Sequence, residues 1–219
     1  MADNIELKDA FANGFWTRTK DVGTVDQPLH VPCSLPLDVT NTPLFTPTNP
    51  SITGLNEAIL TANFSRPSGA LTYASGQLIA NSATAASVVA MSFQVGRAIG
   101  RSGRCGRARL SKATTVTANA IFRAHLYGVG PGAVNGDGGV WLTNQAASYI
   151  GSFTFDLSGT NGRVFSDGVR ANAIPDIGPS MVLQPAATSQ NIFALLEARG
   201  AYAAGSAETF TLDLEVARN

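Results

Sequence analysis

The stretch Glu208-Thr-Phe-Thr-Leu-Asp-Leu-Glu-Val216 decides the fold class of this chain. Four apolar residues alternate in it with polar ones, and they are Phe210, Leu212, Leu214 and Val216. Successive side chains of a β-strand point to opposite faces, so this period of two predicts a strand with one apolar face. Asp213 and Glu215 are then expected on the opposite face, in solvent.

The same alternation recurs along the chain from residue 70 onwards. It is clearest at 89–95, 122–127 and 152–157, and further candidate strands are 71–79, 104–116, 181–183 and 192–199. The last of these is ambiguous, because its apolar spacing also suits one face of a helix. Pairs such as Ser75-Gly76 and Asp137-Gly138 separate the runs and supply the positive φ of tight turns. Short strands separated by such turn signals predict an all-β fold, an antiparallel β-sandwich of jelly-roll-like form.

Length and composition agree with a chain that builds its own core. The chain has 219 residues, of which 44% are hydrophobic and 14% charged. No apolar run approaches the roughly 20 residues of a membrane-spanning helix, so no membrane contact is expected. The polar opening Met-Ala-Asp-Asn-Ile differs from a secretory signal, which favours a protein made in the cytoplasm. Cys33 and Cys105 form neither a disulfide framework nor a metal-binding spacing.

Proline divides the chain into two expected parts, an N-terminal arm at 1–60 and a sandwich body at 61–219. Six of the 11 prolines lie in the first 50 residues, where they remove backbone donors and favour extended backbone. The arm is too apolar for a free linker, and we expect it to pack along its own body or a neighbouring subunit. Its candidate interface residues are Phe11, Phe15, Trp16, Leu35, Leu37 and Phe45.

Charge is segregated although the net charge is zero. Residues 58–136 contain eight basic residues and no acidic one, whereas the acidic residues lie in the segments on either side. The basic residues concentrate in one glycine-rich stretch that contains Arg97, Arg101, Arg104, Arg107 and Arg109. Acidic strands could balance this cluster inside the fold, or it could contact an acidic partner. Because no aromatic residue lies among these arginines to stack on bases, we favour a protein partner over nucleic acid.

Sequence patterns for catalysis or cofactor binding are not convincing. Gly128–Gly139 opens like a dinucleotide-binding fingerprint, but Asn135-Gly136-Asp137-Gly138 would break the helix that this motif requires. A long hairpin loop is the better interpretation, and Asp137 alone cannot make a calcium site. His125 is expected on the outward face of its strand. We therefore expect no enzyme activity, no catalytic residues, no metal and no cofactor.

Several segments resemble structural proteins of tailed bacteriophages. They are residues 70–86, Phe122–Tyr127, Tyr149–Phe153, Phe165–Gly168, Leu195–Arg199 and Glu208–Glu215, together with the opening Met1–Ile5 and Arg18–Gly23. The resemblance implies a virion structural protein, of which capsid cement (decoration) proteins are the best-fitting class. It further implies a position on the capsid surface, the major capsid protein as partner and a homo-oligomer, with a trimer favoured.

A tail, baseplate or fibre component that binds host-surface glycans is the alternative. Such a protein should expose aromatic rings to sugars, and Trp141 beside Tyr149 is the candidate pair. A core position is the more ordinary explanation of Trp141.

Overall fold

The computed structural model describes residues 5–10, 15–22, 25–29, 57–158, 164–166, 169–174 and 181–219. The chain divides into two compact units, Met1–Gly54 and Leu55–Asn219. In the first unit, β1 (Ile5–Ala10), β2 (Phe15–Val22) and β3 (Val25–Leu29) form an antiparallel sheet in chain order. The second unit begins shortly before β4 (Glu57–Ser65), which spans the expected boundary between residues 60 and 61.

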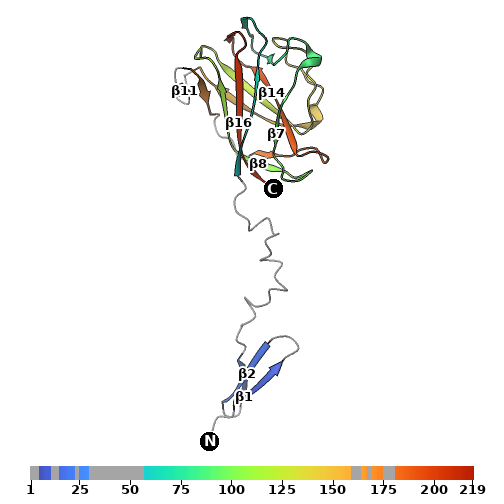
Figure 1. Ribbon diagram of the computed structural model, residues 1–219, viewed down its shortest axis with the longest axis vertical. Helices are drawn as coiled ribbons and strands as arrows, with labels where there is room; N and C mark the ends of the chain where they lie inside the picture. The colour runs from blue at the N-terminus through green and yellow to red at the C-terminus, as the bar shows by residue number, and fades with distance from the viewer. Residues whose placement is uncertain are drawn as a thin grey trace. The chain divides into compact units, whose positions relative to one another are not determined.

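Two antiparallel sheets build the second unit, which confirms the all-β prediction (Figure 1). Sheet I has the order β11-β12-β8-β16-β4, and β13 also pairs with β8. Its strands are β11 (Val164–Ser166), β12 (Ala171–Ala173), β8 (Gly103–Lys112), β16 (Thr209–Arg218), β4 and β13 (Met181–Leu183).

Sheet II has the order β10-β9-β14-β6, and β7 also pairs with β14. Its strands are β10 (Tyr149–Asp156), β9 (Ile121–Tyr127), β14 (Asn191–Ala198), β6 (Gln77–Ile79) and β7 (Met91–Gln94). A small pair joins β15 (Ala203–Ala204) to β5 (Leu71–Thr72). Within the described residues, the helical elements are two 3-10 turns, η1 (Ala85–Ser87) and η2 (Ala146–Ser148). The expected strand at 71–79 is thus split into β5 and β6, and the ambiguous segment 192–199 is a strand.

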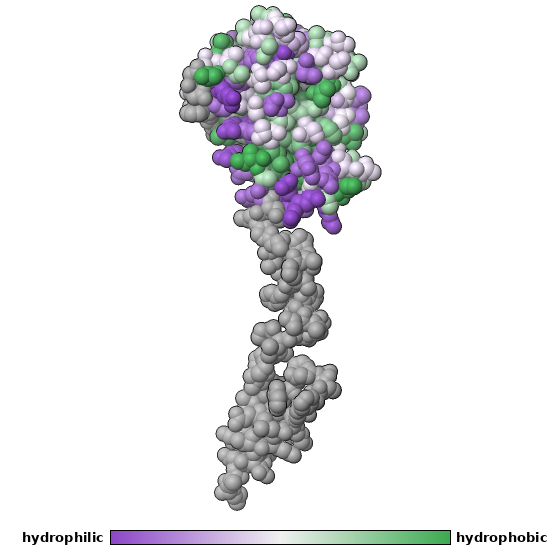
Figure 2. Space-filling model, viewed as in Figure 1, coloured by the Kyte–Doolittle hydropathy of each residue, from purple (hydrophilic) through white to green (hydrophobic). Residues whose placement is uncertain are grey.

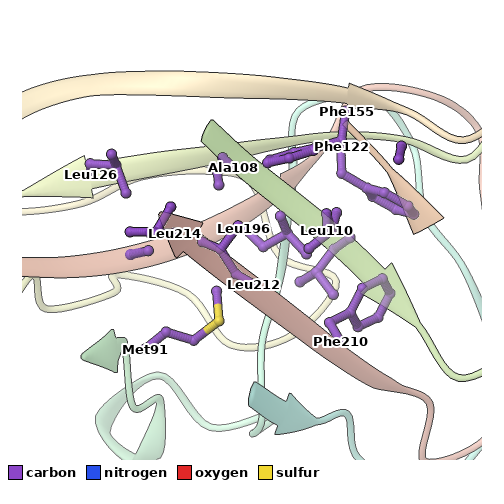
Figure 3. Packing of buried hydrophobic residues seen from close by; sticks show 14 of the residues in the cluster. Met91, Ala108, Leu110, Phe122, Leu126, Phe155, Leu196, Phe210, Leu212 and Leu214 are labelled. Carbon is purple, nitrogen blue, oxygen red and sulfur yellow. The ribbon is translucent and has the colours of Figure 1, made fainter. Parts of the chain in front are cut away.

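Apolar faces of the two sheets meet in one core. Phe210 on β16 lies edge-on to Phe122 on β9, with 5.3 Å between the ring centres, so sheet I packs directly on sheet II. Figure 3 shows side chains of both sheets gathered between the strands, and Phe122, Leu196, Phe210, Leu212 and Leu214 are all fully buried. Every apolar residue of the 208–216 alternation therefore points inward, as the period of two predicts.

The loop from residue 128 to residue 148 connects β9 to β10, which pair as an antiparallel hairpin. This confirms a hairpin loop in place of a nucleotide-binding turn. Gly138 within it has a φ of +78°, and Gly76 before β6 has a φ of +87°. Both glycines take the left-handed backbone that their turn signals predicted.

Candidate interaction surface

Strand β8 carries three of the clustered arginines on the outer face of sheet I. Strict alternation would place Arg104 and Arg107 on opposite faces, because they are three residues apart. The register with β16 shifts here, since Val216 pairs with Cys105 and Glu215 pairs with Arg107, which leaves Gly106 as the extra residue of a bulge. A bulge reverses the alternation after it, so Arg104, Arg107 and Arg109 all face outward and are exposed.

Acidic residues of β16 lie directly opposite two of these arginines. Arg109 donates from Nε and Nη2 to Asp213 Oδ2, at 2.8 and 2.5 Å, and the Thr61 hydroxyl donates to Oδ1 at 2.6 Å. Arg107 Nη2 lies 2.8 Å from Glu215 Oε2. The side chain of Asp213 is only 9% exposed, which corrects the expectation that both acids of this strand lie in solvent. Internal balancing of the basic cluster therefore occurs at Arg107 and Arg109.

Neutralisation does not bury these arginines. Their side chains remain 54% exposed for Arg109 and 53% for Arg107. A hollow of about 150 Å³ lies between them and is flanked by two exposed apolar side chains, Ile59 from β4 and Ile174 after β12. The surface thus combines guanidinium groups, carboxylates and apolar side chains over a few strands.

Arg97 and Arg101 lie in the exposed turn that leads into β8. The backbone N–H of Arg97 donates to the carbonyl of Asn219 at 3.1 Å, which holds this turn beside the end of β16. Ile99 between the two arginines is 64% exposed. Neither arginine forms an ion pair with any residue that the structure describes. Figure 2 shows hydrophilic side chains gathered at the end of the body that Figure 1 marks with the C-terminus.

The apolar residues expected at an interface of the arm cannot be placed on this surface. Phe11, Leu35, Leu37 and Phe45 lie outside the described residues, as do the side chains of Phe15 and Trp16.

The outer face of sheet II carries an aromatic and polar cluster beneath the 128–148 loop. The Trp141 ring stacks on His125, with 4.2 Å between ring centres, and His125 Nε2–H donates to Glu197 Oε2 at 2.8 Å. His125 therefore lies on the outward face of β9, as expected, but it is only 8% exposed because the loop covers it. Burial lowers the pKa of His125, although the Glu197 carboxylate opposes this shift. Because Trp141 packs on His125 and over Leu78, Ala80 and Leu195, it covers the sheet.

Asp137 of the glycine-rich loop joins a buried polar cluster. Asp137 Oδ2 lies 3.0 Å from Arg66 Nη2, and Oδ1 accepts hydrogen bonds from the Tyr73 hydroxyl and the Ala80 N–H. Burial, with the neighbouring Asp137 carboxylate, raises the pKa of Tyr73 well above its ordinary value, which keeps its hydroxyl a donor. Nothing in the sequence signals this contact, since Arg66 and Asp137 are far apart along the chain.

A second buried ion pair lies nearby between Lys112 and Glu208. Their Nζ and Oε1 atoms are 3.3 Å apart, and both side chains are fully buried. The carbonyl of Gly205 accepts from Arg66 Nη1, and its N–H donates to Glu208 Oε2. Gly205 therefore links the two ion pairs into one hydrogen-bonded network that holds several loops together. The buried charged groups of this network thus have a structural role.

Histidine, cysteine and acidic side chains all occur in the described ranges. Within them, no three His, Cys, Asp or Glu side chains are placed to share a metal ion. Burial raises the pKa of the Cys105 thiol to about 11, so it is a poor nucleophile. No helix in these same ranges is long and apolar enough to cross a membrane.

Comparison with known proteins yields no relative. The chain matches no protein-family model, no curated protein and no solved structure.

Proposed function

We propose that this chain is a non-enzymatic virion structural protein, a capsid cement (decoration) protein bound where major capsid protein subunits meet. The proposal takes its class from the resemblance to tailed-phage structural proteins. It includes a jelly-roll-like body, a homo-oligomeric state, a place on the capsid surface and synthesis in the host cytoplasm.

The observation that carries the proposal is the paired charge on the outer face of sheet I. Arg107 and Arg109 are held in register by Glu215 and Asp213 and still expose about half of each side chain. Such preorganised guanidinium groups lose little freedom when they meet carboxylates on a partner, and they set the register of contact. Many copies of one modest contact, repeated over a shell, add up to a large stabilisation.

The copy number of the chain in purified virus particles tests this function. Quantitative mass spectrometry against the major capsid protein gives the ratio. A ratio near parity supports a cement protein. A few copies per particle would instead indicate the tail, baseplate or fibre alternative, and complete absence would reject a virion role.

A variant tests whether the turn before β8 belongs to the contact. The double substitution Arg97→Ala/Arg101→Ala removes two exposed arginines and breaks no ion pair among the described residues. We expect its affinity for particles stripped of this protein to fall about tenfold. Arg123→Ala, which removes charge from sheet II, is the control and should bind like the parent. Equal binding of the double variant across a range of salt would exclude this turn from the contact.

A further inference from the structure

Strand β4 forms one edge of sheet I. It pairs with β16 over its whole length, from Glu57 to Ser65, and no other described strand pairs with it. The Arg66 N–H just after β4 donates to the carbonyl of Glu208, on the β16 side. Backbone groups alternate in direction along an antiparallel strand, so Ile59, Thr61 and Asn63 direct their N–H and C=O groups to the open side.

This edge lacks the features that usually protect an exposed strand. Its sequence, Glu-Ala-Ile-Leu-Thr-Ala-Asn-Phe-Ser, contains no proline and no lysine, and its pairing with β16 runs without a bulge. Long regular edges of this kind tend to pair with another strand. The charge on β4 is confined to Glu57 at its beginning.

The inner face of β4 is only half-covered. Ala58, Leu60, Ala62 and Phe64 are partly exposed, whereas Phe210, Leu212 and Leu214 on the adjacent β16 are fully buried. Phe64 stacks on Phe210 at 5.7 Å, so the core continues up to this edge. One more strand beside β4 would complete the burial of these side chains.

We propose that the missing strand is β4 of a second copy of this chain, paired antiparallel about a two-fold axis at Thr61. Antiparallel pairing of a strand with itself is self-complementary, as a two-fold contact requires. In this register Phe64 of each copy lies opposite Ala58 of the other, and Leu60 lies opposite Ala62. Every large inner side chain thus meets an alanine, as close packing between opposed positions favours.

Other registers about a two-fold axis are less complementary. An axis at Leu60 sets Leu60 against its own copy and leaves Ala58 opposite Ala62. An axis at Ala62 sets Leu60 against Phe64 and Ala62 against itself. The axis at Thr61 also keeps the two Glu57 side chains at opposite ends of the contact, each opposite Ser65, so no like charges meet.

This contact extends sheet I of one copy into sheet I of the other, and it gives assemblies with an even number of copies. It therefore differs from the trimer that the resemblance implies. The inference concerns self-association alone and does not rest on the proposed capsid role.

Sedimentation velocity of the full chain over a concentration series tests the pairing. We expect a monomer–dimer equilibrium. Thr61→Pro removes an N–H on the open side and should raise the dimer Kd by about tenfold or more. Thr61→Val is the matched control, because it also loses the hydroxyl bond to Asp213 but keeps the N–H. A monomer at every concentration, or a dimer with equal Kd in both variants, would overturn the proposal.

Cysteine cross-linking tests the register and does not depend on stability. In a Cys33→Ser background, with Cys105 retained because it is buried, Thr61→Cys should form an intermolecular disulfide under mild oxidation. Two directly opposite Cα atoms lie within about 6 Å, a distance that a disulfide spans. Asn63→Cys should not cross-link to itself, because its equivalents lie about 13 Å apart, but it should cross-link to Ile59→Cys. Equal self-cross-linking at positions 61 and 63 would refute the register.

Discussion

Asp137→Asn is expected to cause a large loss in the stability of the body. Asp137 neutralises Arg66, and the two side chains are only 4% and 2% exposed. The carboxylate accepts from three groups, Arg66 Nη2, the Tyr73 hydroxyl and the Ala80 N–H. An amide of the same shape can still accept at one oxygen, but its NH₂ group would face the guanidinium, which has only donors.

The expected loss follows from the charge that remains. Removing one partner of a buried ion pair costs about 3–5 kcal/mol, because the other charge stays desolvated. For a body of this size, that loss corresponds to a fall of roughly 6–20 °C in Tm. Breaking an exposed pair costs at most about 1 kcal/mol. Glu215→Gln is therefore the matched control, since the Arg107–Glu215 pair is 53% and 36% exposed.

The assay is equilibrium unfolding in urea, followed by the fluorescence of Trp141. The chain has two tryptophans, so a Trp16→Phe background makes Trp141 the single reporter. Trp141 lies in the same loop as Asp137 and packs on His125, so its emission reports on the loop as well as on the sheet beneath it. A loss below about 1 kcal/mol for Asp137→Asn, equal to that of Glu215→Gln, would refute the role of a buried charge pair.

Two further predictions concern the same loop and the face that it covers. Burial lowers the pKa of His125 below 6.5, so at pH values below 6.5 the unfolded chain binds more protons than the folded chain. The free energy of unfolding should therefore fall as the pH drops below 6.5, by no more than about 1.4 kcal/mol per pH unit. The fall should be smaller in His125→Gln than in the parent. Identical pH profiles in urea titrations of parent and variant would contradict this. Gly136→Ala would place a Cβ 1.9 Å from the carbonyl oxygen of Ala83, so we expect the free energy of unfolding to fall by about 1–3 kcal/mol. Gly106→Ala is the control: its Cβ meets no atom within 4 Å, so this substitution should leave the stability nearly unchanged. Thermal unfolding of both variants measures the difference, and equal Tm values would show that the loop moves aside freely.

The alternation of apolar residues was enough to predict strands such as β9, β10 and β16 and their inward faces, but it did not predict β4, β11 or β12. Leu212 and Leu214 are buried because a period of two leaves them no other face once Phe210 is in the core. The same reasoning could not locate the bulge at Gly106. A bulge is visible only when two strands are aligned, and here the partner strand lies about 100 residues further along the chain.

Polar residues were the part of the site that could not be predicted. Alternation treats a polar residue between apolar ones as exposed, so Asp213 was expected in solvent, yet it is buried beside Arg109 and the Thr61 hydroxyl. His125 lies on the expected outward face of β9, but its burial was not predicted, because a loop between adjacent strands covers that face. In both cases the deciding contact joins residues that are distant in sequence, and its energy depends on a partner that local pattern cannot identify.

Pairing of charge within sheet I also bears on the choice between protein and nucleic acid as a partner. Binding to nucleic acid draws its affinity from the release of counterions by unbalanced basic residues. Arg107 and Arg109 are balanced by Glu215 and Asp213 at 2.8 and 2.5 Å, which weakens the field that would attract a phosphate backbone from a distance. Arg97 and Arg101, in the turn before β8, lie outside this balance; on the strands themselves, what remains is a short-range pattern of donors, acceptors and apolar side chains, including Ile59 and Ile174. Such a pattern discriminates by local fit, and for this reason we propose a protein surface as its partner.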